Sequence, residues 1–162
     1  MTFKEMIDVV LGHEGGYVND KDDSGGETNW GISKRAFPDL DIKNLSRDDA
    51  INIYKTHYFI PSRAKELPSE LRLTYFDMCV NMGQSRAVKI LQNAINGKGK
   101  HKVKVDGKIG PNTIRCSKGL ENERLKSYKV LFYARLVTKK PSLEKFWFGW
   151  YRRGVYDESK RR

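Results

Sequence analysis

Residues 71–82 (LRLTYFDMCVNM) constrain the fold more than any other part of this chain, because they are apolar on nearly every side over about three helical turns. A helix of this kind is stable only when other helices surround it. The other periodic apolar segments are separated by glycine and proline, and no convincing long strand or repeat is present. We therefore predict a mainly α-helical chain, with helices over residues 3–14, 32–37, 46–60, 71–82, 85–96, 111–118, 125–140 and 143–153. Ser46 and Asp49 form a capping box at the start of the third helix, which Pro61 is expected to stop, and Ser142 is expected to cap the last helix. Residues 97–110 form a basic, glycine-rich connection, in which the sequence allows a small hairpin across Asp106–Gly107.

The first of these helices carries both a start and a stop signal. Thr2 and Glu5 form a T-x-x-E capping box, and the apolar residues behind it fall on one helical stripe. One further step along the stripe reaches Glu14, and Gly15 and Gly16 then end the helix. The Glu14 carboxyl group is thus expected on the buried face at a helix C-terminus. Desolvation and the negative end of the helix dipole both favour its protonated form there.

The loop that follows Glu14 suggests a chemical use for this carboxyl group. Glycoside hydrolysis needs a carboxylic acid to protonate the departing sugar oxygen, and a second group that positions or activates water across the scissile bond. The loop is rich in glycine, which allows a bulky ligand to approach. Tyr17 and Trp30 could present flat faces to sugar rings, or equally well anchor the core. The candidates for the second group are Asp20, Asp22, Asp23, Thr28 and Asn29.

Two other interpretations fit the residues of this loop. Four residues match positions 1, 3, 5 and 6 of a calcium-binding loop: Asp20, Asp22, Ser24 and Gly25. Position 12 of that loop is Gly31 instead of a bidentate glutamate, which argues against calcium. The other interpretation is structural, with a capping glutamate followed by a solvated acidic turn. On residues alone, it is about as well supported as catalysis.

Net charge narrows the choice of partners. The chain has 31 basic and 20 acidic residues, for a net charge of +11, and should be attracted to polyanions. Much of the positive charge lies in residues 98–108 and 118–140. Nucleic acid, anionic lipids and other anionic envelope polymers, such as those of a cell wall, are the polyanions that would suit this charge. Nucleic acid is set aside because no groove-reading motif is present, and a plain solvating surface is the ordinary alternative.

The cysteines and the N-terminus bear on where the protein works. Cys79 and Cys116 lack metal-ligand spacing, which excludes a zinc knuckle, although a single disulfide stays open. Cys79 lies in an apolar run and is predicted to be buried. Acidic residues interrupt the N-terminal apolar stripe, which is not typical of a signal peptide. No apolar run in the sequence approaches the ~20 residues needed to cross a bilayer. We expect synthesis in the cytoplasm, with another protein opening the membrane if the target lies outside.

Four stretches of the chain together resemble a known family. The first is HEGGYVND…DSGGETNWGIS (13–33), followed by YFDMCVNMGQSRAVKILQNAIN (75–96), VDGKIGPNTI (105–114) and FWFGWYRR (146–153). The first stretch closely resembles the opening signature of glycoside hydrolase family 108, the N-acetylmuramidases of phage endolysins and related bacterial proteins. The other three are similar to the companion peptidoglycan-binding domain. The motifs occur in order and span most of the chain.

This resemblance implies roles for particular residues. It implies that Glu14 is the catalytic acid, and it places Asp23 before the Ser-Gly-Gly turn and Thr28 after it. Their spacing is similar to the Glu, Asp, Thr arrangement of phage lysozymes, in which the latter pair handles the attacking water. Here the gap from Asp23 to Thr28 is one residue shorter, and Ser24 stands where many relatives have proline. No metal or organic cofactor is implied. The expected substrate-binding residues are Tyr17, Asn19, Asn29, Trp30 and Asn81.

The resulting prediction is a lysozyme-like, two-lobed, mainly α fold with a Gly-rich loop or small β-hairpin at the active site. A catalytic lobe over residues 1–85 is expected to pack with a helical peptidoglycan-binding lobe over 86–162 as one compact, monomeric unit. The expected function is that of an endolysin: hydrolysis of the β-1,4 bond between N-acetylmuramic acid and N-acetylglucosamine in peptidoglycan, leading to cell lysis. The alternative is a non-catalytic cell-wall or anionic-polymer binding protein.

Two features outside the loop carry further expectations. Asp77 and Asn81 are polar residues at i and i+4 on the otherwise apolar helix 71–82, where buried polar groups need partners. A structural role is favoured for this pair over contact with substrate. The aromatic stripe of helix 143–153 is expected to pack into the core, and a helix lying on a membrane surface is the alternative.

Overall fold

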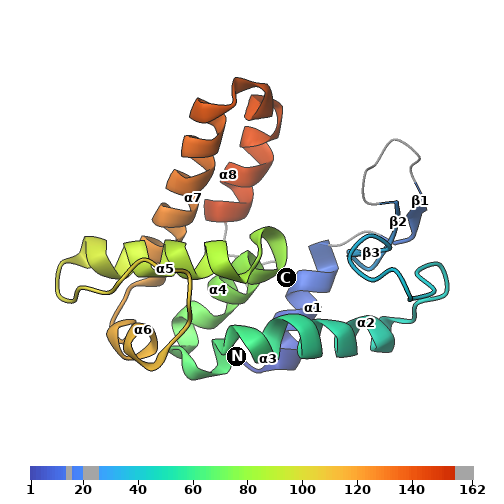
Figure 1. The fold of residues 1–162 in the computed structure, drawn as a ribbon, viewed down its shortest axis with the longest axis horizontal. Coiled ribbons are helices and arrows are strands. Elements are labelled where there is room, and N and C mark those ends of the chain that lie inside the picture. Colours follow the sequence, from blue (N-terminus) through green and yellow to red (C-terminus); the bar gives the residue numbers. More distant parts are fainter. Residues whose placement is uncertain (14–15, 20–25, 156–162) are drawn as a thin grey trace. The chain divides into compact units, whose positions relative to one another are not determined.

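A computed structural model describes residues 1–13, 16–19 and 26–155 (Figure 1). These residues form helices and one small three-stranded antiparallel sheet, so the predicted mainly α fold with a small β element is confirmed. The chain divides into two compact units, residues 1–61 and 62–162. The lobe boundary predicted after residue 85 rests on sequence motifs and stays a prediction.

The first unit begins with helix α1 (Phe3–His13), and the predicted capping box is present. The backbone N–H of Thr2 donates to Glu5 Oε2 at 2.6 Å, and the Glu5 N–H donates to Thr2 Oγ1 at 3.3 Å. The two bonds satisfy donors that would otherwise be free at the helix start. The apolar stripe is buried as its period predicts, at Met6, Ile7, Val10 and Leu11.

The sheet of the first unit comprises β1 (Val18–Asn19), β2 (Glu27–Asn29) and β3 (Ile32–Ser33) in that order. The predicted helix over 32–37 is wrong, because Ile32 and Ser33 pair with Asn29 and Thr28. A helix of six residues gains too few hydrogen bonds to offset its nucleation. Pairing in the sheet also buries the side chain of Ile32.

Helix α2 (Arg47–Tyr54) starts at the predicted Ser46–Asp49 capping box, in which both hydrogen bonds form. It continues as a π-helical turn, η1 (Lys55–Phe59), and then as α3 (Ile60–Ser62). The helical path therefore passes through Pro61, where a stop was predicted. A π turn widens the hydrogen-bond register just before a residue that has no N–H to donate.

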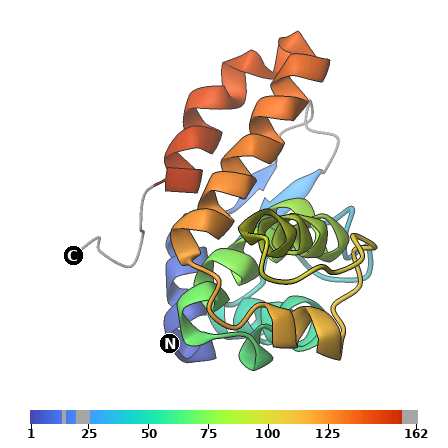
Figure 2. The ribbon, with the colours of Figure 1, turned by 90° about the vertical axis from the view of Figure 1, so that its left-hand side faces the viewer.

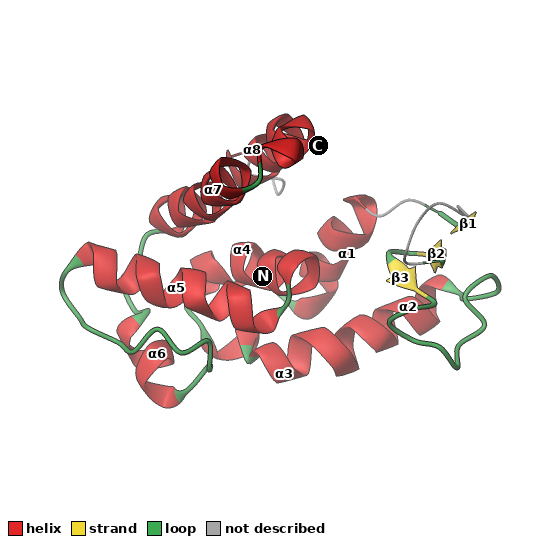
Figure 3. Cartoon of the chain, turned by 45° about the horizontal axis from the view of Figure 1, so that its top comes forward, coloured by secondary structure: helices red, strands yellow, loops and turns green. Residues whose placement is uncertain are grey.

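The second unit is built from η2 (Ala64–Glu66), α4 (Ser69–Met82), α5 (Gln84–Lys98), α6 (Pro111–Cys116), α7 (Asn122–Lys139), η3 (Pro141–Phe146) and α8 (Trp147–Val155). Helix α4 contacts both α5 and α7, and α7 contacts α8 in an antiparallel pair that is clearest in Figure 2. Figure 3 colours the chain by secondary structure and distinguishes these helices from the strands and loops. As predicted for a surrounded helix, α4 buries Leu71, Tyr75, Phe76, Met78 and Cys79.

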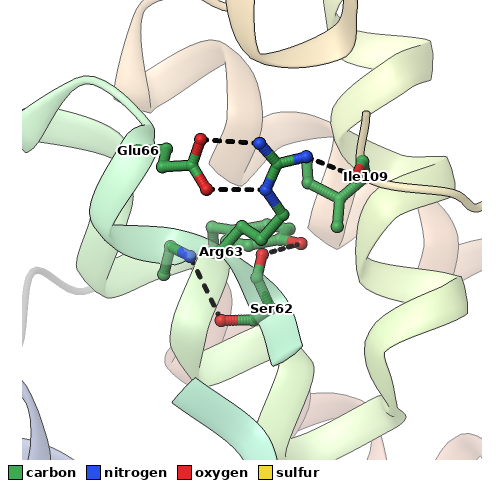
Figure 4. A network of polar contacts seen from close by, with 6 residues as sticks. Ser62, Arg63, Glu66 and Ile109 are labelled. Carbon is green, nitrogen blue, oxygen red and sulfur yellow. Dashed lines mark hydrogen bonds and ion pairs between the residues drawn. The ribbon is translucent and has the colours of Figure 1, made fainter. Parts of the chain in front are cut away.

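A polar network fixes the start of the second unit (Figure 4). Arg63 has a left-handed backbone (φ 55°), and its guanidinium donates twice to Glu66 at 2.6 Å and once to the Ile109 carbonyl at 3.3 Å. The Tyr75 hydroxyl donates to the Ser62 carbonyl at 3.1 Å. The Arg63 guanidinium lowers the pKa of the exposed Glu66 carboxyl through these bonds. The network ties the segment before α4 to the segment before α6.

Residues 99–110 form an irregular loop, so the hairpin considered at Asp106–Gly107 is not observed there. The loop is held at this point by hydrogen bonds to the buried side chain of Gln92 instead of by strand pairing. Its Nε2 donates to Asp106 Oδ1 at 2.9 Å, and its Oε1 accepts from the N–H groups of Asp106 and Gly107 at 3.1 and 3.0 Å. Gln92 donation is the main reason that the pKa of Asp106 lies below its usual value. The side-chain amide of Gln92 thus holds the turn at Asp106–Gly107, where pairing between the two arms of a hairpin was expected.

The end of the chain differs from the prediction in two ways. Ser142 lies in the 3₁₀ turn η3 instead of capping the last helix, and α8 continues through the buried Gly154. Phe146, Phe148 and Tyr151 are exposed, at 47%, 69% and 43%, so the expectation that this stripe packs into the core is wrong for them. Trp150 of the same stripe does pack, because its ring stacks on Tyr133 of α7.

The two cysteines are both free and buried, which excludes a disulfide between them. The predicted burial of Cys79 is confirmed, and burial raises the pKa of its thiol to about 12. Such a thiol stays protonated at physiological pH and behaves as a small apolar side chain.

A buried ion pair joins α4 to α7. Lys129 Nζ lies 2.8 Å from Asp77 Oδ2, and the two side chains are 2% and 14% exposed. Asn81 Nδ2 donates to Asp77 Oδ1 at 2.8 Å, and Arg153 Nε of α8 lies 3.8 Å from the same oxygen. The structural role favoured for Asp77 and Asn81 is consistent with these contacts.

Removing the acidic partner should therefore destabilise the second unit. We expect Asp77→Ala to lower the free energy of unfolding by about 3–5 kcal/mol, because it leaves the Lys129 ammonium buried without its counter-ion. Urea denaturation at pH 7, followed by circular dichroism, measures the change.

The double variant Asp77→Leu with Lys129→Met is the matched control. It removes both charges together and should recover most of the lost stability. A double variant no more stable than Asp77→Ala would show that the pair contributes through shape instead of charge.

Candidate active site

The predicted site residues fall into three groups. Glu14 and Asp23, with Asp20 and Asp22, lie outside the described residues. Asn81 lies on α4 in the second unit. The others come together on the small sheet of the first unit and its flanking turn: Tyr17, Asn19, Thr28, Asn29 and Trp30.

The sheet fixes both ends of the segment that contains Asp23. Asn19, the last residue of β1, pairs with Glu27, the first residue of β2. The chain therefore leaves β1 and returns to β2 at neighbouring points. Thr28 occupies the central strand, where it pairs with Val18 on one side and Ser33 on the other. Helix α1 ends at His13, directly before Glu14.

Tyr17 and Glu27 form a polar pair on this sheet. The Tyr17 hydroxyl donates to Glu27 Oε1 at 2.9 Å, and this hydrogen bond raises the pKa of the exposed tyrosine. The bond holds a ring that is 39% exposed, which is a suitable arrangement for stacking on a sugar. Glu27 was not among the residues predicted from the sequence. Its only signal there was its place immediately before Thr28.

Asn29 acts as a structural anchor. It is 7% exposed, and its Nδ2 donates to the Ile42 carbonyl at 3.0 Å, with longer bonds of 3.4 Å to the carbonyls of Lys43 and Leu45. One side-chain amide thereby satisfies backbone acceptors of the loop that precedes α2. A substrate contact by Asn29 stays a prediction, and its amide nitrogen is already used within the protein.

Trp30 and Gly31 form a tight turn with an unusual backbone. Asn29 pairs with Ile32, and both intervening residues have positive φ (54° and 75°), as in a type I′ hairpin turn. Tryptophan in this region costs about 1–2 kcal/mol relative to a right-handed backbone. Two contacts hold it there: indole Nε1 donates to the Leu45 carbonyl at 3.0 Å, and the Trp30 carbonyl accepts from the Tyr54 hydroxyl at 2.9 Å. Of the two roles left open by the sequence, the structure shows the anchor.

A shallow groove lies next to this anchor. Its volume is about 460 Å³, and Leu45, whose carbonyl holds Trp30, is one of its lining residues. Leucine and isoleucine form its apolar part, and its polar part consists of Asp41, Asn44, Asp49 and Asn52. Apolar surface with a few carboxylate and amide groups suits a sugar, which presents both C–H faces and hydroxyls. No residue pattern in the sequence points to this groove.

Neither a metal centre nor a membrane span is found in the described part of the chain. Within residues 1–13, 16–19 and 26–155, no group of three or more histidine, cysteine, aspartate or glutamate side chains could hold a metal ion. Across the same ranges, none of the helices combines the length and the apolar character needed to cross a bilayer. The residues proposed for a calcium loop, from Asp20 to Gly25, lie outside these ranges.

Comparison with known families identifies the class of protein to which these features belong. Residues 7–83 match the family described as Glycosyl hydrolase 108, and residues 86–155 match the family described as Predicted Peptidoglycan domain. The resemblance to glycoside hydrolase family 108 with its companion domain is therefore confirmed. A glycosyl hydrolase segment is thus followed by a peptidoglycan segment on one chain, which indicates a glycoside hydrolase that acts on peptidoglycan.

A solved structure agrees with the predicted lysozyme-like fold. The structure of Brucella abortus SagA superposes with a TM-score of 0.76 at 26% sequence identity, over 94% of this chain and 88% of that chain. Among curated proteins, no significant sequence match is found.

The anchoring role of Asn29 can be tested by its removal. We expect Asn29→Ala to lower the free energy of unfolding by about 1–3 kcal/mol, because the buried Ile42 carbonyl loses its donor. Thermal denaturation of the full chain measures this loss. Tyr17→Phe, which removes an exposed hydrogen bond from the same sheet, is the control and should change stability by less than about 0.5 kcal/mol. Equal stability of the Asn29 variant and wild type would contradict the anchor.

Proposed function

We propose that this protein is an endolysin-type N-acetylmuramidase, which hydrolyses the β-1,4 bond between N-acetylmuramic acid and N-acetylglucosamine and so lyses bacterial cells. The observation that carries the proposal is the order of two family matches on one chain. A glycosyl hydrolase segment that includes the Glu14 loop precedes a peptidoglycan domain. The sugar specificity follows from the resemblance of the loop to the muramidase signature.

In the proposed mechanism, Glu14 protonates the glycosidic oxygen as the bond to the departing sugar breaks. Asp23, with help from Thr28, positions or activates the attacking water, or stabilises the oxocarbenium-like transition state. The place of Thr28 on the central strand supports this role, because a rigid strand holds a hydroxyl more accurately than a loop does. No metal or organic cofactor takes part.

Substrate binding is proposed to use the exposed face of the first unit. The ring of Tyr17, held by Glu27, would stack on a sugar, with Asn19 beside it on β1. Trp30 would border the same surface through its fixed turn, while Asn29 holds the loop behind it. Asn81 belongs to this proposal only through the sequence resemblance, since its amide donates to Asp77.

The proposed setting is that of an endolysin. The protein would be made in the cytoplasm, act as a monomer, and reach the cell wall after another protein opens the inner membrane. Its net charge of +11 would favour contact with anionic polymers or lipids of the envelope.

The decisive experiment compares Glu14→Gln with wild type on purified peptidoglycan. We expect the variant to lose activity by a factor on the order of 10²–10⁴, because an amide cannot donate the proton that the leaving oxygen needs. Release of reducing sugars gives the rate, and mass spectrometry of the products shows whether N-acetylmuramic acid carries the new reducing end.

Glu144→Gln, which neutralises an exposed glutamate of η3, is the matched control and should retain wild-type activity. A Glu14→Gln variant that still clears peptidoglycan at the wild-type rate would overturn the assignment of the acid. Wall binding by a wild-type protein that releases no sugar would instead favour a non-catalytic binding protein.

A further inference from the structure

The second unit contains a small pocket that the proposed hydrolysis does not use. It lies where the C-terminal ends of α5 and α6 meet, and its volume is about 60 Å³. Its apolar floor is formed by buried side chains of Ile95, Cys116 and Leu120. Its rim carries three lysines, Lys98, Lys100 and Lys118.

Backbone geometry places the basic residues at this rim. Gly99 ends α5 in the left-handed region (φ 82°), and Gly119 turns the chain after α6 in the same way (φ 77°). Asn96 then fastens the loop after Gly99, because its Nδ2 donates to the Val103 carbonyl at 2.9 Å and its Oδ1 accepts from the Val103 N–H at 2.7 Å. The short segment with Lys100 is therefore held at both ends.

The three lysines do not have the same role. Lys98 Nζ donates to the Gly119 carbonyl and to Glu121 Oε1, the latter at 2.9 Å. Donation from Lys98 and Arg124 helps to hold the pKa of Glu121 at about 2, so the Glu121 carboxylate stays ionised throughout the physiological range. Lys98 thus closes the pocket wall, and its charge is compensated.

Lys100 and Lys118 are different, because neither forms an ion pair with any residue in the described ranges. Both are exposed at the rim, next to the half-buried ring of His101. Two uncompensated ammonium groups above a concave surface attract an anion, and the low-dielectric floor strengthens that attraction.

The shape of the pocket selects among anions. A phosphate group would satisfy the lysines and leave the apolar floor in contact with water. A short aliphatic carboxylate satisfies both, because its alkyl group covers the floor while its oxygens reach the rim. The volume of about 60 Å³ lies far below the ~300 Å³ at which sites for larger ligands begin, which favours a small group over a whole sugar ring.

We propose that this pocket binds the free C-terminal carboxylate of a peptidoglycan stem peptide, with the methyl group of its terminal alanine on the floor. The choice of peptide rests on the proposed function and on the match of residues 86–155 to a peptidoglycan domain. The second unit would then hold the wall through its peptides, while the first unit acts on its glycan.

Nuclear magnetic resonance of the ¹⁵N-labelled full chain tests the proposal, with a wall pentapeptide ending in D-alanine as the probe. Saturable shift changes should concentrate at residues 95–101 and 116–120. The same peptide with a C-terminal amide should bind at least about tenfold more weakly, which corresponds to the loss of one ionic contact. Shifts elsewhere, no binding, or equal binding of the amide would each overturn the proposal.

Two further comparisons identify the source of any binding. The double variant Lys100→Gln with Lys118→Gln should lose the pentapeptide, whereas Lys139→Gln with Lys140→Gln, which removes the same charge from the end of α7, should retain it. Inorganic phosphate should compete only weakly. Phosphate binding as tight as that of the peptide at the same amides would show a general anion site and overturn the aliphatic carboxylate.

The test is independent of hydrolysis. Glu14→Gln should bind the pentapeptide as wild type does. A wild-type protein that cleaves peptidoglycan without binding the peptide would refute the pocket alone. A protein that binds the peptide without cleaving peptidoglycan would refute the muramidase alone.

Discussion

The ion pair between Asp77 and Lys129 is the interaction on which the second unit depends. It places two opposite charges inside a contact between helices that is otherwise apolar, with the lysine 2% exposed. Such a pair contributes little net stability compared with well-packed hydrophobic residues, but it penalises every arrangement in which the charges are separated. It therefore acts mainly on specificity, because α7 can slide along α4 only by breaking it. Arg153 extends the same constraint to α8.

The first unit is organised by hydrogen bonds to irregular backbone instead of by charge. The loop before α2 has no strand partner, and its carbonyls are satisfied by the side chains of Asn29 and Trp30. Asn29 is the last residue of β2, the strand that carries Thr28, and Trp30 begins the turn that follows this strand. The surface proposed to bind substrate is therefore rigid, because Asn29 and Trp30 also form the hydrogen bonds that hold the loop before α2. Tyr17 adds to this surface with an exposed ring that a carboxylate holds in place.

Local sequence signals predicted some parts of this structure well and others poorly, for identifiable reasons. The capping boxes at Thr2 and Ser46 and the surrounded helix α4 depend on nearest neighbours and apolar period, and all three are confirmed. The helix predicted over 32–37 is wrong because the chain reverses at Trp30–Gly31 and returns as strand β3. This turn could not be predicted, because it places a tryptophan in a backbone region that tryptophan rarely adopts. The loop at Asp106 could not be predicted because its support, Gln92, is distant in sequence and polar within a core. For the site, the resemblance supplied Glu14 and Asp23, whereas Glu27 and the groove beside Leu45 emerge only from the arrangement of strands and loops.

The anchored indole of Trp30 has a practical consequence for spectroscopy. The chain contains three tryptophans, and the other two, Trp147 and Trp150, both lie on α8. One tryptophan fluorophore thus belongs to the first unit and two belong to the second. Trp150 stacks on Tyr133, so its emission senses the contact between α7 and α8, whereas the emission of Trp30 senses the turn beside Thr28. Replacing the α8 pair with phenylalanine would leave a single natural probe of the first unit, and ligand titrations could then be followed on that unit without any added label.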